Sequence, residues 1–213
     1  MVRAARSRRM PAKAKAAVAV AVLILPAMWL VDTVQRMSLQ GKLSPIASEI
    51  AGRQVGVRCP GWWGRLLSPG DTNAGVVAID EDGRMAGHTD LRTATCDELA
   101  AVIGGGREQQ LACVSRSTSC GDDAQATAWA VNTLAHEAVH LRGIQDEAVT
   151  ECHAVQNLAL AAQRLGATPE QARGLALLHL ETSPAKKPVQ YQLPGGCENG
   201  GPLDERPADP AWP

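Results

Sequence analysis

Aromatic side chains are scarce in this sequence of 213 residues, which contains no Phe, one Tyr and five Trp. Most of its apolar residues are Ala, Val and Leu, and a core of such small aliphatic side chains suits helices that pack closely together. An excess of charge of one sign is also lacking, since 21 basic residues face 22 acidic ones and the formal net charge is -1. Nucleic-acid binding needs a clustered basic surface, so we expect no nucleic-acid partner.

The cysteines lack any CxxC spacing, which argues against a zinc site built from cysteine sulfurs. All six cysteines follow an apolar run near the N-terminus: Cys59, Cys96, Cys113, Cys120, Cys152 and Cys197. An even number of cysteines in an exported domain predicts up to three disulfides. The sequence does not decide how they pair. Cys113 with Cys120 is the easiest local pair, and Cys96 with Cys152 would tie an early helix to a later one.

The N-terminal segment, residues 1–15, is rich in Arg and Lys and contains no acidic residue. An unbroken apolar run of 16 residues, from Ala16 to Val31, follows and ends at Asp32. The run is shorter than the roughly 20 residues of a comfortable membrane span, but tilt, local thinning of the bilayer and the flanking residues compensate. We therefore predict a transmembrane signal-anchor at residues 16–34, with the basic segment in the cytoplasm and the remainder of the chain outside it.

A cleaved secretory signal is the alternative, because the apolar region of such a signal is about 7–15 residues long. The stretch "AMWLVDTVQRM" offers no good small-x-small cleavage site, which favours an uncleaved anchor. With cleavage, the protein would be secreted. Beyond the anchor we assign residues 35–45 to a short polar stalk, residues 46–182 to an extracytoplasmic domain, and residues 183–213 to a Pro- and Gly-rich tail that only Cys197 is expected to hold in place.

The pattern of the folded domain predicts an α+β fold that is mainly helical. The stretches "AGVVAID" and "EDGRMAGHTDL" are typical of two strands joined by a turn at Asp82-Gly83. Four helices are expected to begin near Thr95, Asp122, Asp146 and Thr168. Thr95 with Glu98, and Thr168 with Gln171, have the spacing of capping boxes, and Gly143 and Gly166 mark helix ends.

The second of these helices contains His136-Glu137-Ala138-Val139-His140, which matches HExxH. Residues four apart lie on one face of a helix, so both imidazoles can reach one ion. Glu137 lies about 100° further round the helix, beside the metal, where it can take a proton from metal-bound water. Zinc would lower the pKa of that water to roughly 7. The alternative is a coincidental pair of surface histidines on an alanine-rich helix.

A catalytic zinc usually has three protein ligands and keeps a fourth position for water. Glu147, Glu151 and His153, all in the next expected helix, are the candidates for the third ligand. Glu147 and Glu151 share one face of that helix, whereas His153 points about 240° round from Glu147 and is expected to face away.

An HExxH motif followed by a helix with Glu, and then an acidic residue one turn later, resembles the gluzincin type of zinc metallopeptidase. The resemblance implies that Glu147 is the third ligand and that Glu151 accepts a hydrogen bond from His136. It also implies a small zincin-like domain that hydrolyses peptide bonds. Only six residues separate His140 from Glu147, fewer than in familiar members, but Gly143 permits a tight hairpin. The stretch "HEAVHLRGIQDEAVTECHAVQ" also resembles a recurrent actinobacterial envelope protein, which implies no particular substrate.

These observations together predict a membrane-anchored, extracytoplasmic zinc metallopeptidase with Zn²⁺ as its cofactor and a peptide or protein of the cell envelope as its substrate. The alternative is a non-catalytic exported envelope protein, either stapled by zinc or free of metal.

Other candidate residues carry weaker signals. His88, on the expected hairpin, would be exposed or would lie near a cleft edge, and His179 would favour the dipole at a helix C-terminus. Arg142 and Tyr191 are candidate donors to an oxyanion. Trp62 and Trp63 would form a small apolar patch, either in the core or at an interface.

Overall fold

The computed structural model describes residues 12–61, 75–79, 85–117, 119–183, 187–208 and 212. Within them the chain forms six α-helices, a three-stranded sheet and a short 3-10 helix, so the predicted α+β class with mainly helical content is confirmed. Part of the basic N-terminus (residues 1–11), the predicted turn Asp82-Gly83, and both Trp62 and Trp63 lie outside the described residues.

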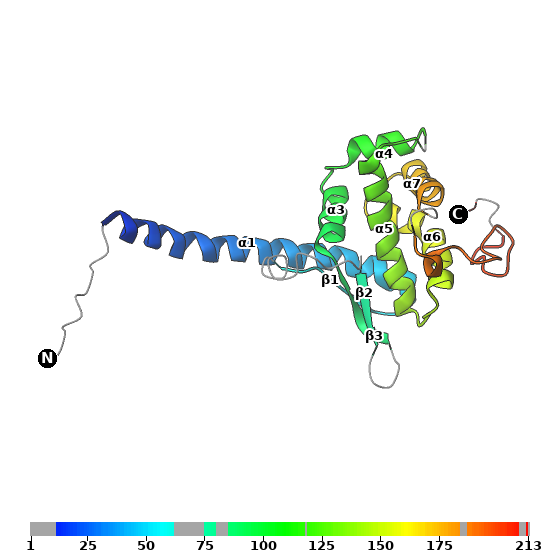
Figure 1. Cartoon of the computed structure of the whole chain (residues 1–213), viewed down its shortest axis with the longest axis horizontal. Helices are drawn as coiled ribbons and strands as arrows, with labels where there is room; N and C mark the ends of the chain where they lie inside the picture. Colours follow the sequence, from blue (N-terminus) through cyan, green and yellow to red (C-terminus); the bar gives the residue numbers. More distant parts are fainter. Residues whose placement is uncertain are drawn as a thin grey trace.

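The long helix α1 (Ala12–Ala51) extends well beyond the body of the protein at its N-terminal end (Figure 1). Large apolar side chains between Ile24 and Met37 are exposed, whereas Leu43 and Ile46 are buried in the core. The residues assigned to a stalk therefore continue this helix, and the packed domain begins a few residues earlier than expected. Across the described part of the chain, no helix combines the length and the apolar character that a bilayer span requires.

The sheet has the strand order β1-β3-β2. Strands β2 (Gly75–Ile79) and β3 (Met85–Leu91) pair antiparallel, as the predicted hairpin requires. Strand β1 (Gly56–Arg58) pairs parallel with β3, a contact that no local pattern in the sequence signals. Both β2 and β3 contact α5, and β2 forms one of the two edges of the sheet among the described strands.

Two short helices differ from the prediction. Helix α3 (Thr93–Ile103) begins two residues before the expected N-cap, so Thr95 is a buried helical residue and the predicted capping box is wrong. Glu98 instead accepts hydrogen bonds from Arg107 and Thr127 because it faces the following segment and α5. Helix α4 (Glu108–Val114) was not predicted.

The three helices that carry the site agree closely with the sequence pattern. Helix α5 (Asp122–Leu141) is central and contacts α1, α3, α6 and α7. Gly143, with a positive φ of 107°, allows the sharp connection to α6 (Glu147–Arg164), where the Asp146 side chain caps the first turn. The capping box of Thr168 and Gln171 at the start of α7 (Pro169–Thr182) is confirmed.

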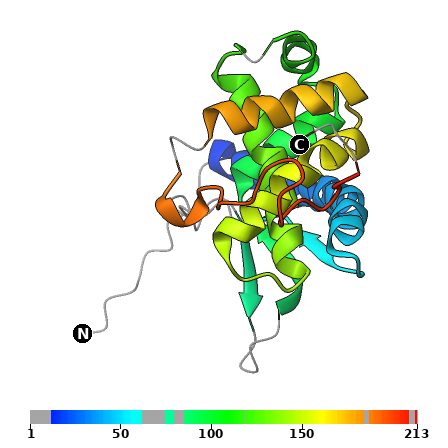
Figure 2. The same cartoon turned by 90° about the vertical axis from the view of Figure 1, so that its right-hand side faces the viewer.

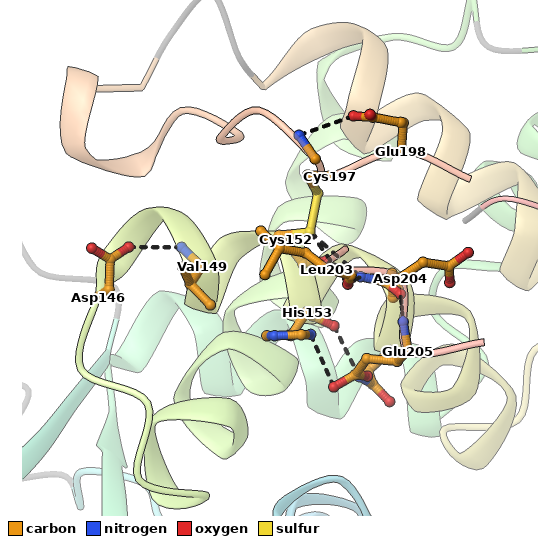
Figure 3. Close-up of a disulfide and its surroundings, with 12 residues drawn as sticks. Asp146, Val149, Cys152, His153, Cys197, Glu198, Leu203, Asp204 and Glu205 are labelled. Atoms are coloured by element: carbon orange, nitrogen blue, oxygen red, sulfur yellow. Dashed lines mark hydrogen bonds and ion pairs between the residues drawn. A yellow bond between two sulfur atoms is a disulfide. The ribbon is translucent and has the colours of Figure 1, made fainter. Parts of the chain in front are cut away.

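Three disulfides hold the chain together, and one of the two suggested pairs is confirmed. Cys113 bonds to Cys120 as expected. The suggested pair of Cys96 and Cys152 is wrong, because β1 lies beside β3 and β3 leads directly into α3, which brings Cys59 to Cys96. Cys152, in α6, bonds to Cys197 in the C-terminal tail (Figure 3).

The C-terminal tail is held by more than its disulfide, which corrects the prediction that only Cys197 would fix it. It includes the 3-10 helix η2 (Val189–Tyr191) and passes over α6 (Figure 2). The Gln156 side chain donates to the Leu203 carbonyl at 2.9 Å, and Glu205 lies 2.9 Å from His153 Nδ1. His153 therefore faces the tail (Figure 3) and not the other histidines, as the helical angle predicts.

Candidate metal centre

Helix α5 presents the HExxH residues on a largely buried surface. Only 7% of His136 and 6% of Glu137 is exposed, although both side chains are polar. A polar group that is buried this deeply is costly unless it has partners. Their direct partners come from α6 and the sheet, and residues of α7 and the tail bond one of those partners, Glu151.

The start of α6 brings a third donor to the two histidines. Glu147 Oε2 lies 3.0 Å from His136 Nε2 and 3.2 Å from His140 Nε2. One ligand atom from each of these residues lies within 4.8 Å of the other two, so the group could hold a metal ion. Around a tetrahedral zinc with bonds of about 2.0–2.1 Å, neighbouring ligand atoms would be about 3.3–3.4 Å apart. The two separations from Glu147 come within a few tenths of an ångström of that spacing.

The opposite nitrogen of each imidazole has an acceptor of its own. His140 Nδ1 lies 2.7 Å from the Ile144 carbonyl, and His136 Nδ1 lies 3.0 Å from Glu151 Oε2. Because a carbonyl and a carboxylate only accept, Nδ1 of each ring is the donor to them, which leaves Nε2 of a neutral ring available to bind a metal at the shared point. Such outer hydrogen bonds fix the tautomer and the orientation of a metal-binding histidine.

Glu151 is the centre of a buried polar cluster behind His136. Its side chain is 3% exposed, and it accepts from Asn132 Nδ2 at 3.1 Å, from His179 at 3.0 Å and from the Lys187 ammonium. Burial alone would raise the pKa of Glu151, but hydrogen bonds from His136 and His179 and the charge of Lys187 hold this pKa well below its usual value. Glu151 therefore stays ionised.

Two members of this cluster were not identified from the sequence. His179 lies in the last turn of α7, as expected. The sequence did not signal that it is 2% exposed and bonds Glu151 in the core. Lys187 carried no local signal, because it follows α7 in a segment with the composition of a loop. Burial lowers the pKa of both side chains, although Glu151 opposes this.

The electrostatics of the metal-binding face itself depend on its carboxylates. Burial opposes protonation of His136, but hydrogen bonds to Glu147 and Glu151 outweigh it and raise its pKa to about 9. Burial raises the pKa of Glu137 to about 7, with the nearby Glu147 adding to this effect. The charge of His136 and a hydrogen bond from Thr89, at 3.4 Å, act in the opposite direction.

Strand β2 approaches Glu137 very closely. A Cβ added to Gly75 would lie 2.7 Å from both Cγ and Cδ of Glu137, which is closer than any side chain tolerates. Only glycine therefore fits at this position with Glu137 in its present place.

A cavity of about 530 Å³ opens in front of the three donors. Its walls are β2, the histidine face of α5, the start of α6 and tail residues from Lys187 to Tyr191. Glu137 and Glu147 both line it, and the Glu147 side chain is 34% exposed. The donor group is therefore open on one side.

Of the other functional candidates predicted from the sequence, Tyr191 lies at the cavity, whereas Arg142 and His88 do not. Tyr191 lines the cavity, with its ring centroid 5.8 Å from that of His136. Arg142 does not line it, and its guanidinium donates to the Ile50 carbonyl of α1 at 2.7 Å. His88 also lies outside the cavity wall, 3.5 Å from Asp90.

No protein-family model matches this sequence, and no curated protein or solved structure matches it at a significant level. The similarity to gluzincins stays a prediction based on the motif alone. The chemistry of the site is therefore inferred from its own groups: two imidazole nitrogens and a carboxylate oxygen around one point, with a second carboxylate beside them.

Proposed function

We propose that this protein is a zinc-dependent peptidase, anchored in a membrane by its N-terminal helix and acting outside the cytoplasm. One observation carries the proposal: His136, His140 and Glu147 converge on a single point at the wall of an open cavity, and Glu137 lines the same wall. A chance pair of surface histidines would have neither a third donor nor acceptors behind each ring.

The donor set favours zinc over other common ions. Two imidazoles and one carboxylate form one of the ligand sets of catalytic zinc sites, whereas Ca²⁺ and Mg²⁺ prefer oxygen ligands throughout. A structural zinc site is usually closed by four protein ligands, mostly cysteines. All six cysteines of this chain are in disulfides, and the three donors face an open cavity. When bound, zinc would lower the pKa of a water molecule to about 7 and polarise a substrate carbonyl.

The side chains around this point suit hydrolysis of an amide bond. Glu137, with a pKa of about 7, can accept a proton from a water molecule near neutral pH and later deliver it to the leaving amine. Tyr191 is the candidate donor to the developing oxyanion, because Arg142 is engaged elsewhere. Edge strand β2 borders the cavity and offers backbone groups to an extended peptide.

The proposed location rests on the disulfides and on α1. Three disulfides are typical of proteins that mature in an oxidising compartment. The segment 16–34 lies within α1, and the large apolar side chains from Ile24 to Val34 are about half exposed, so they are available for contact with lipid. The domain that follows would then lie outside the cytoplasm, where envelope peptides or proteins are its substrates.

Replacing Glu137 with Gln tests the proposal, because the amide keeps the shape of the side chain but cannot act as a base. We expect the full-length wild-type protein to hold one zinc ion and to hydrolyse a peptide mixture. The Glu137→Gln variant should keep its zinc and lose activity by roughly 100-fold or more. Glu170→Gln, an exposed change in α7, serves as the matched control and should behave like wild type.

The alternatives give different results in the same experiment. If zinc only staples the helices of a non-catalytic envelope protein, the wild type holds zinc but hydrolyses nothing. In a metal-free binding module, metal analysis of the purified protein finds no zinc. Either outcome would overturn the peptidase proposal, and the second would also overturn the metal site.

A further inference from the structure

Exposed apolar side chains gather at one place on the folded domain. Beyond α1, the large apolar residues that are exposed among those described are Val76 at 46%, Trp129 at 39% and Val189 at 79%. Val76 and Trp129 line the cavity of the metal centre, and Val189 lies between two tail residues that also line it. Isolated apolar residues on a surface need no explanation, but an apolar cluster around one cavity marks a binding site.

Trp129 is the largest of these side chains and lies on the same face of α5 as His136. Seven residues, or about two helical turns, separate the two, which places them about 10 Å apart along the helix axis. The Lys187 ammonium lies 5.0 Å from the indole centroid, and the His179 ring lies 6.2 Å from it. The indole is thus held in place by its neighbours while more than a third of it remains open to solvent.

The apolar groups that line the cavity come from separate elements: β2 contributes Val76 and α5 contributes Trp129. Val189 of η2 lies between the lining residues Pro188 and Gln190. An extended peptide rises about 3.3 Å per residue, so a span of about 10 Å corresponds to three residues. A peptide whose reacting carbonyl lies at the metal-binding point therefore has a side chain about two or three residues away within reach of Trp129.

We propose that the site selects peptides with a large apolar side chain, preferably aromatic, about two or three residues from the bond that is cleaved, and that Trp129 determines this specificity. This inference rests on the proposed peptidase function. Trp129 provides a rigid surface at low entropic cost, since an indole has two rotatable side-chain bonds. Val76, which lines the same cavity, adds a second apolar surface for the bound side chain.

A scanned peptide series tests the inference with the full-length protein. Quenched fluorescent peptides of one alanine-rich sequence would carry a single Phe at successive positions on either side of the scissile bond. We expect kcat/KM to be about tenfold higher when Phe is two or three residues from that bond than for the Ala parent. Trp129→Ala should abolish this preference, so that Phe and Ala peptides have equal kcat/KM while the zinc content stays that of the wild type, and Trp129→Leu should retain part of the preference.

Trp29→Ala is the matched control, because Trp29 is an exposed tryptophan on α1, outside the cavity wall. It should keep the full preference for Phe. Equal kcat/KM values for all peptides with the wild-type protein, or a Phe preference that survives in Trp129→Ala, would overturn the inference.

A binding measurement separates this inference from the proposed function. Fluorescence anisotropy with labelled Phe and Ala peptides, on the Glu137→Gln variant, measures recognition without turnover. If the wild type hydrolyses no peptide but the Phe peptide still binds about tenfold more tightly than the Ala peptide, and loses this advantage in Glu137→Gln/Trp129→Ala, the peptidase proposal fails and the apolar recognition stands. Equal binding of the two peptides would overturn the recognition itself.

Discussion

Replacing Glu151 with Gln removes the charge of a carboxylate that is 3% exposed and accepts hydrogen bonds from four side chains. The amide keeps one accepting oxygen and presents an NH₂ group where the second oxygen was. Either orientation therefore turns a donor toward other donors, and the buried Lys187 ammonium loses its counter-charge. Breaking a buried ion pair on one side costs about 3–5 kcal/mol. We expect the metal-free variant to lose about that much free energy of unfolding.

The same change should weaken zinc binding, because His136 Nδ1 then faces either an NH₂ donor or a neutral amide oxygen in place of the carboxylate. Removal of an outer partner of a metal ligand typically lowers metal affinity by about 10- to 100-fold. Urea unfolding of the metal-free protein, with the disulfides intact, gives the first quantity, and competition with a chelator gives the second. Glu170→Gln, an exposed change in the first turn of α7, should leave zinc affinity unchanged and should lower the stability far less than Glu151→Gln.

A double-mutant cycle with Lys187→Met identifies the source of the lost stability. Met fills a similar volume without a charge, so Glu151→Gln/Lys187→Met no longer leaves an ammonium unpaired. We expect the double variant to be more stable than the sum of the single changes by about 1–3 kcal/mol. If Glu151→Gln unfolds at the wild-type urea concentration and binds zinc as tightly as the wild type, Glu151 does not hold His136 and our account of the cluster is wrong.

Two further predictions concern pH and strand β2. The pKa of His136 in the metal-free protein is raised from 6.5 to about 9, so this residue stabilises the fold fully below pH 6.5 and loses its contribution as the pH rises through 9. Zinc must displace that proton, so its affinity should rise about tenfold per pH unit and level off above about pH 9; an affinity that stays constant from pH 6 to 9, measured by chelator competition, would contradict the assignment. Gly75→Ala should push Glu137 out of place, lower kcat and cost about 1–3 kcal/mol of stability. Gly87→Ala in β3, where an added Cβ meets nothing within 4 Å, is its control, and equal activity of the two variants would refute the steric argument.

The elements that carry the metal-binding residues could be predicted because their signals are local. The spacing of His136 and His140 sets their common face, and Gly143 and Asp146 mark where one helix ends and the next begins. In a hairpin of two such helices, Glu147 at the start of the second helix must lie close to the histidines at the end of the first. Its carboxylate lies against both imidazoles, at 3.0 and 3.2 Å.

Predictions that relied on pairs distant in the sequence were less successful. The partner of Cys96 depends on the parallel pairing of β1 with β3, which no local pattern encodes. One local prediction also failed: Thr95 was expected as the N-cap, but the helix begins two residues earlier and Thr95 is buried within it. The tail has the composition of a flexible segment, yet hydrogen bonds from Gln156 and the disulfide of Cys197 hold it on α6.

The sequence by itself determined that one helix carries two imidazoles and a carboxylate on adjacent faces, and that a short turn returns a second carboxylate to them. Helical periodicity and turn chemistry act over a few residues, so these features follow from the local order of the chain. Tertiary structure decided what surrounds them: His179 and Lys187 reach Glu151 from 28 and 36 residues away, and Gly75 and Thr89 approach Glu137 from the sheet. Those contacts exist only when separate elements pack together, because each is set by the burial of apolar faces and not by the residues next to it in the chain.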